Sequence, residues 1–89
     1  MNFGEAIEAA RAGKKIQRAG WNGKSMWVCH MPGRVIPAGK VGERIRDFVP
    51  TGDVTVLGYF VMWTADQKWL PGWLASQTDM LATDWSVVA

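Results

Sequence analysis

Six of the 89 residues are tryptophan, and this feature most restricts how the chain can fold. A domain of this length buries only about 60–65% of the surface that its unfolded chain exposes, so its core has room for only some of the indole rings. Tryptophan is enriched at contacts between proteins and against flat ligands. We therefore expect the remaining tryptophans to lie at subunit contacts or against a ligand, in a stable homo-oligomer.

The charged residues limit the classes of partner that the chain can bind. The formal net charge is +2, and an excess of arginine and lysine in the middle of the chain is partly offset by Glu43 and Asp47. Binding to duplex DNA needs a dense basic stripe, which this sequence does not have. The balance instead suits a small anionic ligand, and we expect no nucleic-acid partner.

Cysteine usage and hydropathy indicate the compartment. Cys29 is the only cysteine, which excludes an internal disulfide and fits a reducing environment. Its apolar neighbours predict a buried, inert thiol. The first residues lack the apolar stretch of a signal peptide, and no apolar run approaches the length that a membrane span needs. We expect a soluble cytoplasmic protein without a membrane partner.

The N-terminus carries a helix-start signal. Asn2 and Glu5 have the spacing of an N-cap residue and its partner three positions on, which predicts a helix over residues 3–12. Apolar residues recur at spacings of three and four along this segment, so one face should be buried. Gly13 is the expected stop.

A second signal of this kind lies near the C-terminus. Ser76 and Asp79 have the spacing of a variant capping box, in which each side chain accepts a hydrogen bond from the other residue's backbone. They predict a helix over residues 77–83. Because so short a helix is unstable alone, we expect it to dock through Met80 and Leu81.

The rest of the chain is read as strands and connections. The stretch 34–58 is broken repeatedly by glycine and proline, and we expect a long excursion with at most short strands, serving a function or an interface. The predicted fold is α+β, a single small domain over residues 1–89. Its N-terminal helix packs on an antiparallel sheet, and its short C-terminal helix precedes a final strand. The expected strands cover residues 15–18, 26–31, 59–64, 69–70 and 84–88.

The side chains needed for catalysis or metal binding do not form a recognisable set. His30 is the only histidine, and with one cysteine it gives no metal-ligand spacing. No serine, histidine and aspartate arrangement of a nucleophilic enzyme is apparent. His30 is interpreted as a packed strand residue. We expect no catalytic residues, no metal and no cofactor, so an enzyme is the weaker class of function.

Three short segments instead combine the side chains that nucleotide binding uses. A purine base gains about 1–3 kcal/mol by stacking on an aromatic face. Ribose hydroxyls are matched by compact polar side chains, and phosphates by lysine or by the N–H groups at a helix start. The candidate ligand-binding residues are Trp21, Asn22 and Lys24 in the first segment, Thr64 and Asp66 in the second, and Ser76, Gln77, Thr78 and Asp79 in the third.

Each of these segments also has an ordinary structural explanation. Ser76 and Asp79 should act mainly as helix caps, which leaves Gln77 and Thr78 freer to face a pocket. Trp21 is either a ligand platform or part of the core. Because it stands beside a turn rather than within an alternating strand, we expect it to be partly exposed.

Taken together, the motifs resemble a known family. The chain is similar to small phage and prophage proteins associated with Thoeris anti-defence, the "sponges" that sequester a nucleotide immune signal. The resemblance covers nearly the whole chain apart from residues 32–58. The motifs that carry it are Met1-Asn-Phe-Gly-Glu-Ala6, Gly13-Lys-Lys-Ile16, Arg18-Ala-Gly-Trp-Asn-Gly-Lys24, Thr64-Ala-Asp66, Trp73-Leu-Ala-Ser-Gln-Thr-Asp79 and Asp84-Trp85.

This resemblance implies a specific activity. Members of the family are non-catalytic, bind cyclic ADP-ribose derivatives made by bacterial TIR-domain enzymes, and so keep the signal from its effector. Some members resemble sponges for cyclic dinucleotides, at a separate site. The family assembles as homotetramers with pockets between subunits, and acts in the cytoplasm of the bacterial host.

Two classes of function therefore compete. The first is a nucleotide-sequestering oligomer. The second is a structural or protein–protein interaction module whose tryptophans fill oligomer interfaces and which takes no small ligand. A nucleic-acid-binding protein is a distant third, because the charge is weak.

Overall fold

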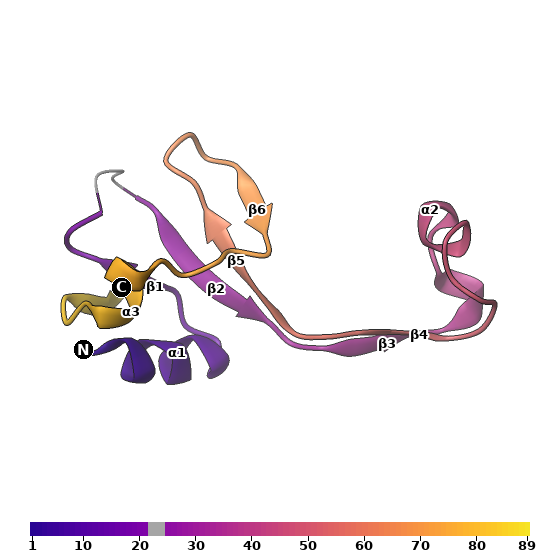
Figure 1. Cartoon of the computed structure of the whole chain (residues 1–89), viewed down its shortest axis with the longest axis horizontal. Helices are drawn as coiled ribbons and strands as arrows, with labels where there is room; N and C mark the ends of the chain where they lie inside the picture. The colour runs from indigo at the N-terminus through magenta and orange to yellow at the C-terminus, as the bar shows by residue number, and fades with distance from the viewer. Residues whose placement is uncertain (22–24) are drawn as a thin grey trace.

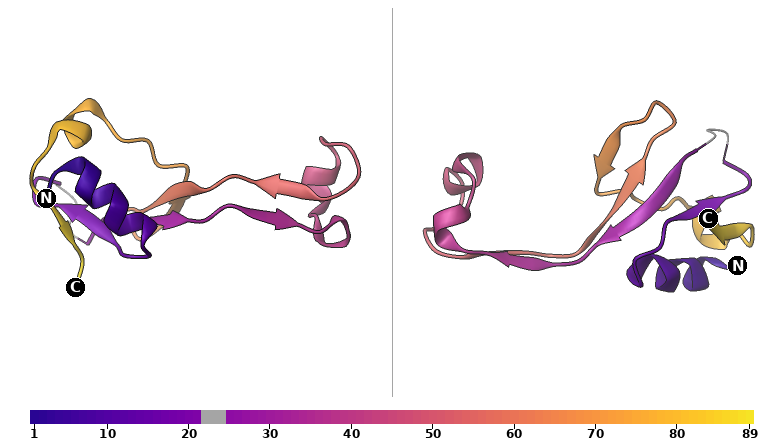
Figure 2. Two further views of the ribbon diagram at one scale, coloured as in Figure 1. Left: turned by 90° about the horizontal axis from the view of Figure 1, so that it is seen from below. Right: turned by 180° about the vertical axis from the view of Figure 1, so that it is seen from behind.

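The computed structural model describes residues 1–21 and 25–89, and it has a folded body from which a long two-stranded arm extends (Figure 1). Both termini lie in the body, and the arm comprises residues 32–58. The molecule measures 45 Å along its longest axis and 26 and 25 Å along the others. Two further views show the same narrow arm, bent relative to the body (Figure 2).

The body is built on an antiparallel five-stranded sheet with the strand order β6-β5-β2-β1-β7. The central pair, β2 and β5, is joined over five residue pairs, from Trp27↔Trp63 to Met31↔Tyr59. The last strand, β7, pairs with β1 and closes the other edge. The predicted α+β class is confirmed. The strands are β1 (Ile16–Arg18), β2 (Trp27–Met31), β5 (Tyr59–Trp63), β6 (Trp69–Pro71) and β7 (Trp85–Val87).

Helix α1 (Phe3–Arg11) covers one face of this sheet, as predicted. Its capping box is complete: the Asn2 side chain accepts the Glu5 N–H at 2.8 Å, and the Glu5 carboxylate accepts the Asn2 N–H at 2.9 Å. Gly13 follows with a φ of 97°, a conformation that favours glycine at a helix end. The helix buries its alanine face in the main core, which consists of Ala6, Ala10, Ile16, Val28 and Trp85.

The second predicted cap is also confirmed, but the docking residues are wrong. Helix α3 (Gln77–Leu81) begins at Ser76 and ends two residues earlier than expected. Met80 and Leu81 are exposed, and Asp79 is the buried residue of the helix. A helix of five residues presents too little apolar surface to dock by burial alone. Polar contacts of Asp79 decide which face turns inward.

The arm contains the short strands expected in the glycine- and proline-rich segment. Strands β3 (Arg34–Ile36) and β4 (Val54–Val56) form a separate two-stranded antiparallel ribbon. At the far end lie a 3-10 turn, η1 (Ala38–Lys40), and a single helical turn, α2 (Glu43–Arg46), neither of which was predicted. Asp53 ties the two sides together, because its carboxylate accepts the Ala38 N–H at 2.9 Å.

Arm and body meet where two backbones approach closely. A Cβ on Gly33 would lie 3.0 Å from the Val56 carbonyl oxygen, and one on Gly58 would lie 3.1 Å from the Nε2 atom of His30. A side chain at either position would be crowded and would have to displace these neighbours by a few tenths of an ångström. The His30 ring lies 5.2 Å from the Phe60 ring, so the expectation of a packed strand histidine is confirmed.

The tryptophans divide as the composition predicted. Trp85 is fully buried, Trp69 is 48% exposed, and the other four are half-buried.

Cys29 is half-buried rather than fully buried, and burial raises the pKa of its thiol. Within residues 1–21 and 25–89, no helix is long and apolar enough to cross a membrane.

Candidate ligand-binding site

Arg18 connects strand β1 to two segments near the C-terminus, which lie more than sixty positions away in the sequence. From strand β1 its Nε atom donates to Asp84 at 2.9 Å, and its Nη1 atom donates to Asp79 at 2.8 Å. The second oxygen of Asp84 accepts the Gly20 N–H at 2.8 Å. The guanidinium side chain is only 13% exposed. This junction fixes α3 and the start of β7 against the first strand of the body.

The same contacts determine the charge states. Hydrogen bonding by Arg18 holds the pKa of Asp84 below its ordinary value. Burial would raise the pKa of Asp79, but hydrogen bonds from Arg18, Trp21 and Ser76 outweigh burial and lower it. The two carboxylates in turn raise the pKa of Arg18. All three groups are therefore charged at neutral pH.

Trp21 is held at this junction by its polar edge and by its neighbours. Its indole Nε1 donates to the same Asp79 oxygen, at 3.1 Å. Its ring lies 5.2 Å from Trp85 and 6.3 Å from Trp73, both in edge-to-face geometry. The side chain is half-buried. The expectation of partial exposure is confirmed, and the indole has a fixed orientation.

In the first turn of α3, different residues were expected to cap the helix and to face a ligand. Ser76 accepts the Asp79 N–H at 3.0 Å, and the second carboxylate oxygen of Asp79 accepts the Ser76 N–H at 3.1 Å. Both oxygens of Asp79 are thus engaged within the protein. Gln77 and Thr78 are exposed on the same turn. Ser76 is exposed too, but it takes part in the capping box, whereas Gln77 and Thr78 do not.

Thr64 and Asp66 lie in a different place, the turn between β5 and β6. The Thr64 hydroxyl donates to Asp66 and accepts the Lys68 N–H, and Lys68 forms an ion pair with Asp66 at 3.0 Å. The hydrogen bond from Thr64 is the main cause of the lowered pKa of Asp66. These contacts account for the turn itself, and the turn lies apart from α3 (Figures 1 and 2).

The structure therefore brings only part of the predicted set together. Trp21 lies beside Asp79 and the capped turn, whereas Thr64 and Asp66 form a separate group. Asn22 and Lys24 lie outside the described residues.

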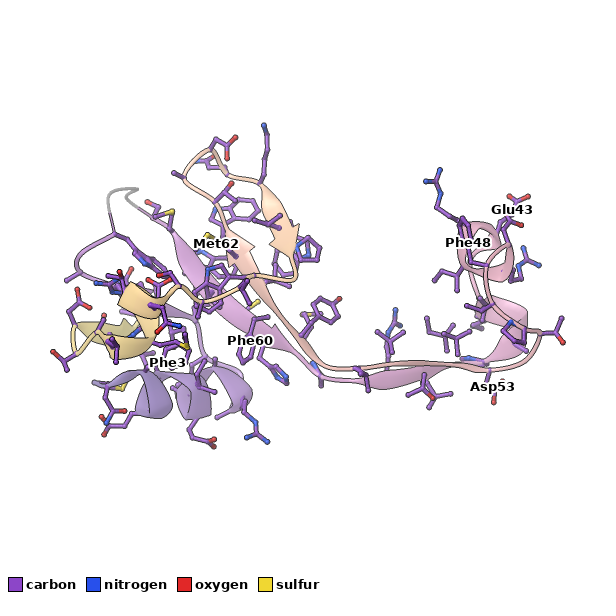
Figure 3. All side chains as sticks on the ribbon, viewed as in Figure 1. Phe3, Glu43, Phe48, Asp53, Phe60 and Met62 are labelled. Carbon is purple, nitrogen blue, oxygen red and sulfur yellow. The ribbon has the colours of Figure 1, made fainter. Side chains whose placement is uncertain are left out.

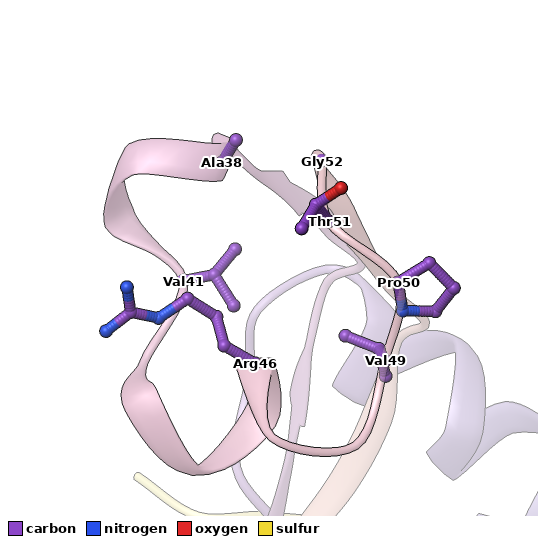
Figure 4. A pocket seen from close by; sticks show the side chains of 7 residues that line it. All are labelled: Ala38, Val41, Arg46, Val49, Pro50, Thr51 and Gly52. Carbon is purple, nitrogen blue, oxygen red and sulfur yellow. The ribbon is translucent and has the colours of Figure 1, made fainter.

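Two features of the structure were not predicted from the sequence. The first is Arg18, whose partners lie 61 and 66 positions away, so no local spacing indicates the pairing. The second is a hollow of about 150 Å³ at the arm tip (Figure 4). Its wall is mostly apolar, and the lining residues are Ala38, Val41, Arg46, Val49, Pro50, Thr51 and Gly52. Within the described part of the chain, no three acidic, histidine or cysteine residues gather as metal ligands.

Comparison with known proteins identifies the family of this chain. The sequence model of one protein family, described as the Thoeris anti-defense 2-like domain, matches residues 1–88. The chain belongs to this family. It is also 36% identical, over 90 residues, to Thoeris anti-defense 2 of Bacillus phage SP01, with all of this chain and 96% of the phage protein covered. The family resemblance read from the motifs is confirmed, and membership supports a phage anti-defence role.

Proposed function

We propose that this family member is a non-catalytic sponge, which binds a cyclic ADP-ribose-type immune signal made by TIR enzymes and keeps it from its effector. The observation that carries the proposal is the oriented indole of Trp21 beside the exposed start of α3, in a chain that matches the family along its length. An indole face suits a purine, and short polar side chains suit ribose hydroxyls.

The proposal gives the predicted residues different duties. Trp21 stacks the base, and Gln77 and Thr78 contact the ribose or phosphate edge. Ser76 and Asp79 support these contacts without touching the ligand. Together they form the capped turn, and Asp79 orients the indole of Trp21. Asn22 and Lys24 follow Trp21 in sequence and are assigned to the same pocket. Thr64 and Asp66 are assigned to a pocket wall completed by another subunit of a homotetramer.

Binding and chemical integrity of the ligand test the proposal together. Calorimetric titration should give saturable binding of a TIR-derived cyclic ADP-ribose isomer, with cyclic dinucleotides and linear ADP-ribose as comparison ligands. A thermal shift should accompany it, since a ligand at a hundredfold excess over Kd adds about 2.7 kcal/mol of stability. Heating the complex should release the starting compound unchanged. Enzyme-dependent conversion would contradict a sponge, and absence of binding by every nucleotide would favour the interaction module.

Trp21→Ala should weaken nucleotide binding by about 1–3 kcal/mol, because it removes the stacking face. Trp21→Phe is the matched control: it keeps a flat ring but loses the N–H that donates to Asp79. The phenylalanine variant should retain most of the affinity. Calorimetry measures both, and circular dichroism checks that each variant is folded. Normal affinity in the alanine variant would remove Trp21 from the site.

Substitutions in the first turn of α3 should separate stability from affinity. Ser76→Ala removes a cap and should cost about 0.5–2 kcal/mol of stability whether or not ligand is present. Gln77→Ala and Thr78→Ala remove exposed side chains and should reduce affinity at near-normal apo stability. Urea unfolding and calorimetry give the two quantities. If neither Gln77→Ala nor Thr78→Ala changes affinity, this segment is only a structural cap.

A further inference from the structure

Three hydrogen-bonded contacts hold Trp21, and each of them leads to Arg18. The indole Nε1 donates to the Asp79 oxygen that also accepts Arg18 Nη1, at 3.1 and 2.8 Å. The Gly20 N–H donates to one oxygen of Asp84, and the other oxygen accepts Arg18 Nε. The Trp21 N–H itself donates to the Arg18 carbonyl oxygen at 3.3 Å. Arg18 therefore anchors both the indole of Trp21 and the backbone that leads into it.

The backbone just before Trp21 also lies against the ion pair. A Cβ on Gly20 would lie 3.0 Å from a carboxylate oxygen of Asp84 and 3.2 Å from the Nη2 atom of Arg18. Because Gly20 passes so close to both charged groups, a shift of the guanidinium displaces the chain at this point. The position of Trp21 thus depends on Arg18 through direct packing as well as through hydrogen bonds.

Apolar packing alone does not fix the direction of the indole. Trp73 and Trp85 meet the ring edge-to-face, and the energy of such packing depends mainly on the buried area, whereas a hydrogen bond is directional. The capping box engages one carboxylate oxygen of Asp79. The other oxygen, which holds the indole, is fixed by Arg18. The orientation of the ring is therefore set by the ionic contact.

Arg18 is the cation of this junction, since Asp79 and Asp84 each form an ion pair with it. The arginines of α2 are too distant to replace it. They lie at the far end of the arm, where Glu43 and Phe48 stand well away from the body (Figure 3). The Arg18 side chain is mostly buried. Its contribution to a ligand site is made through the groups that it holds.

We propose that Arg18 is a positioning residue of the ligand site. It holds the indole of Trp21 through Asp79, and the backbone of Trp21 through Asp84, in the orientation that stacks a base. This inference rests on the proposed function, in which Trp21 supplies the stacking face. A side chain that is already ordered does not have to be ordered on binding, and such ordering lowers affinity by about two- to tenfold.

Affinity measurements in two backgrounds test this role. Lysine at position 18 keeps the charge but cannot donate to both carboxylates in the planar geometry of arginine. Calorimetric titration with a TIR-derived cyclic ADP-ribose isomer should therefore show an affinity about two- to tenfold lower for Arg18→Lys. In a Trp21→Ala background the same substitution should change affinity by less than about twofold, because the positioned side chain is gone. Unchanged affinity in the first background, or an equal loss in both, would overturn the proposal.

Arg11→Lys is the matched control for this titration. Arg11 also pairs with a carboxylate, that of Glu8 at 3.2 Å, but its side chain is 62% exposed on α1. The control should bind as the wild type does. Failure of the proposed function gives a different result: neither the wild type nor Arg11→Lys would bind nucleotide, and the positioning role would fall with it.

The indole N–H resonances of the ligand-free protein report on the orientation directly. The Trp21 signal in a proton–nitrogen correlation spectrum is identified by its absence from Trp21→Phe. In Arg18→Lys its order parameter should fall toward the flexible range, below about 0.6. The Trp85 signal is an internal reference, because that indole donates to the backbone carbonyl of Asp79, and it should not change. A rigid Trp21, or an equal loss at Trp85, would contradict a positioning role.

If Arg18→Lys does not fold, Asp84→Asn decides. The Asp84 side chain is 34% exposed, so this substitution is easier to accommodate. Asparagine has one acceptor oxygen, whereas Arg18 and Gly20 each use a different oxygen of Asp84. Affinity should again fall in the wild-type background and stay unchanged in the Trp21→Ala background. No fall in the wild-type background would overturn the proposal.

Discussion

Replacing Trp85 with alanine should lower the free energy of unfolding by about 3–5 kcal/mol, the usual cost of removing a large buried aromatic side chain. Trp85 is 2% exposed and lies at the centre of the core, against Phe3 and Trp21. Its indole N–H also donates to the Asp79 carbonyl at 2.9 Å, so the variant loses this buried hydrogen bond and leaves that carbonyl with only the longer bond from the Ala82 N–H, at 3.3 Å. For so small a domain this loss is a large share of the total stability.

Urea unfolding followed by far-UV circular dichroism, at one fixed protein concentration, measures the effect of this substitution. Trp85→Phe keeps an apolar ring and loses the hydrogen bond, so it should be destabilised by a smaller amount. Leu74→Ala is the surface control and should stay within about 0.5 kcal/mol of the wild type, because Leu74 is almost fully exposed. An alanine variant as stable as this control would place Trp85 outside the core.

Acid should destabilise the protein through the Arg18 junction, and removing Arg18 should weaken that dependence on pH. Asp79 and Asp84 have lower pKa values in the folded state than the ordinary aspartate value near 3.9. Their contribution to stability is therefore fully present above that ordinary value and is lost as pH falls through the folded pKa values. The urea midpoint should be nearly flat between pH 8 and about 5 and fall steeply below about 4.

Arg18→Met tests the origin of this dependence. It leaves Asp79 buried without its cation, so the variant should be strongly destabilised at pH 7, and its midpoint should change less between pH 7 and pH 3 than that of the wild type. Arg18→Lys is the matched control. Lysine keeps the positive charge but lacks the planar guanidinium group that reaches both carboxylates. The stability of Arg18→Lys at pH 7 and its change with pH should therefore lie between those of the wild type and Arg18→Met. Parallel acid profiles in all three proteins would assign the acid sensitivity to other carboxylates.

Local signals in the sequence were sufficient for several parts of this structure. The capping boxes at Asn2 and Ser76 were predicted because each depends on residues only three positions apart. The strand pattern gave the α+β class for a related reason, since alternation is visible within a few residues. The tryptophan count indicated that much of the indole surface would stay outside the core, and only Trp85 is fully buried.

Only the tertiary structure decided the remaining features, because they depend on residues that the fold brings together from distant positions. Arg18 pairs with Asp79 and Asp84 across more than sixty residues, and this ionic contact rather than the apolar pair Met80 and Leu81 decides how α3 docks. Trp27, Trp63 and Trp69 lie side by side because the strand register of β2, β5 and β6 aligns them. The sequence by itself determined the two capped helices and the strands of the main sheet, and that the core would be small. Long-range pairing determined which charges are buried and which aromatic side chains stay partly exposed.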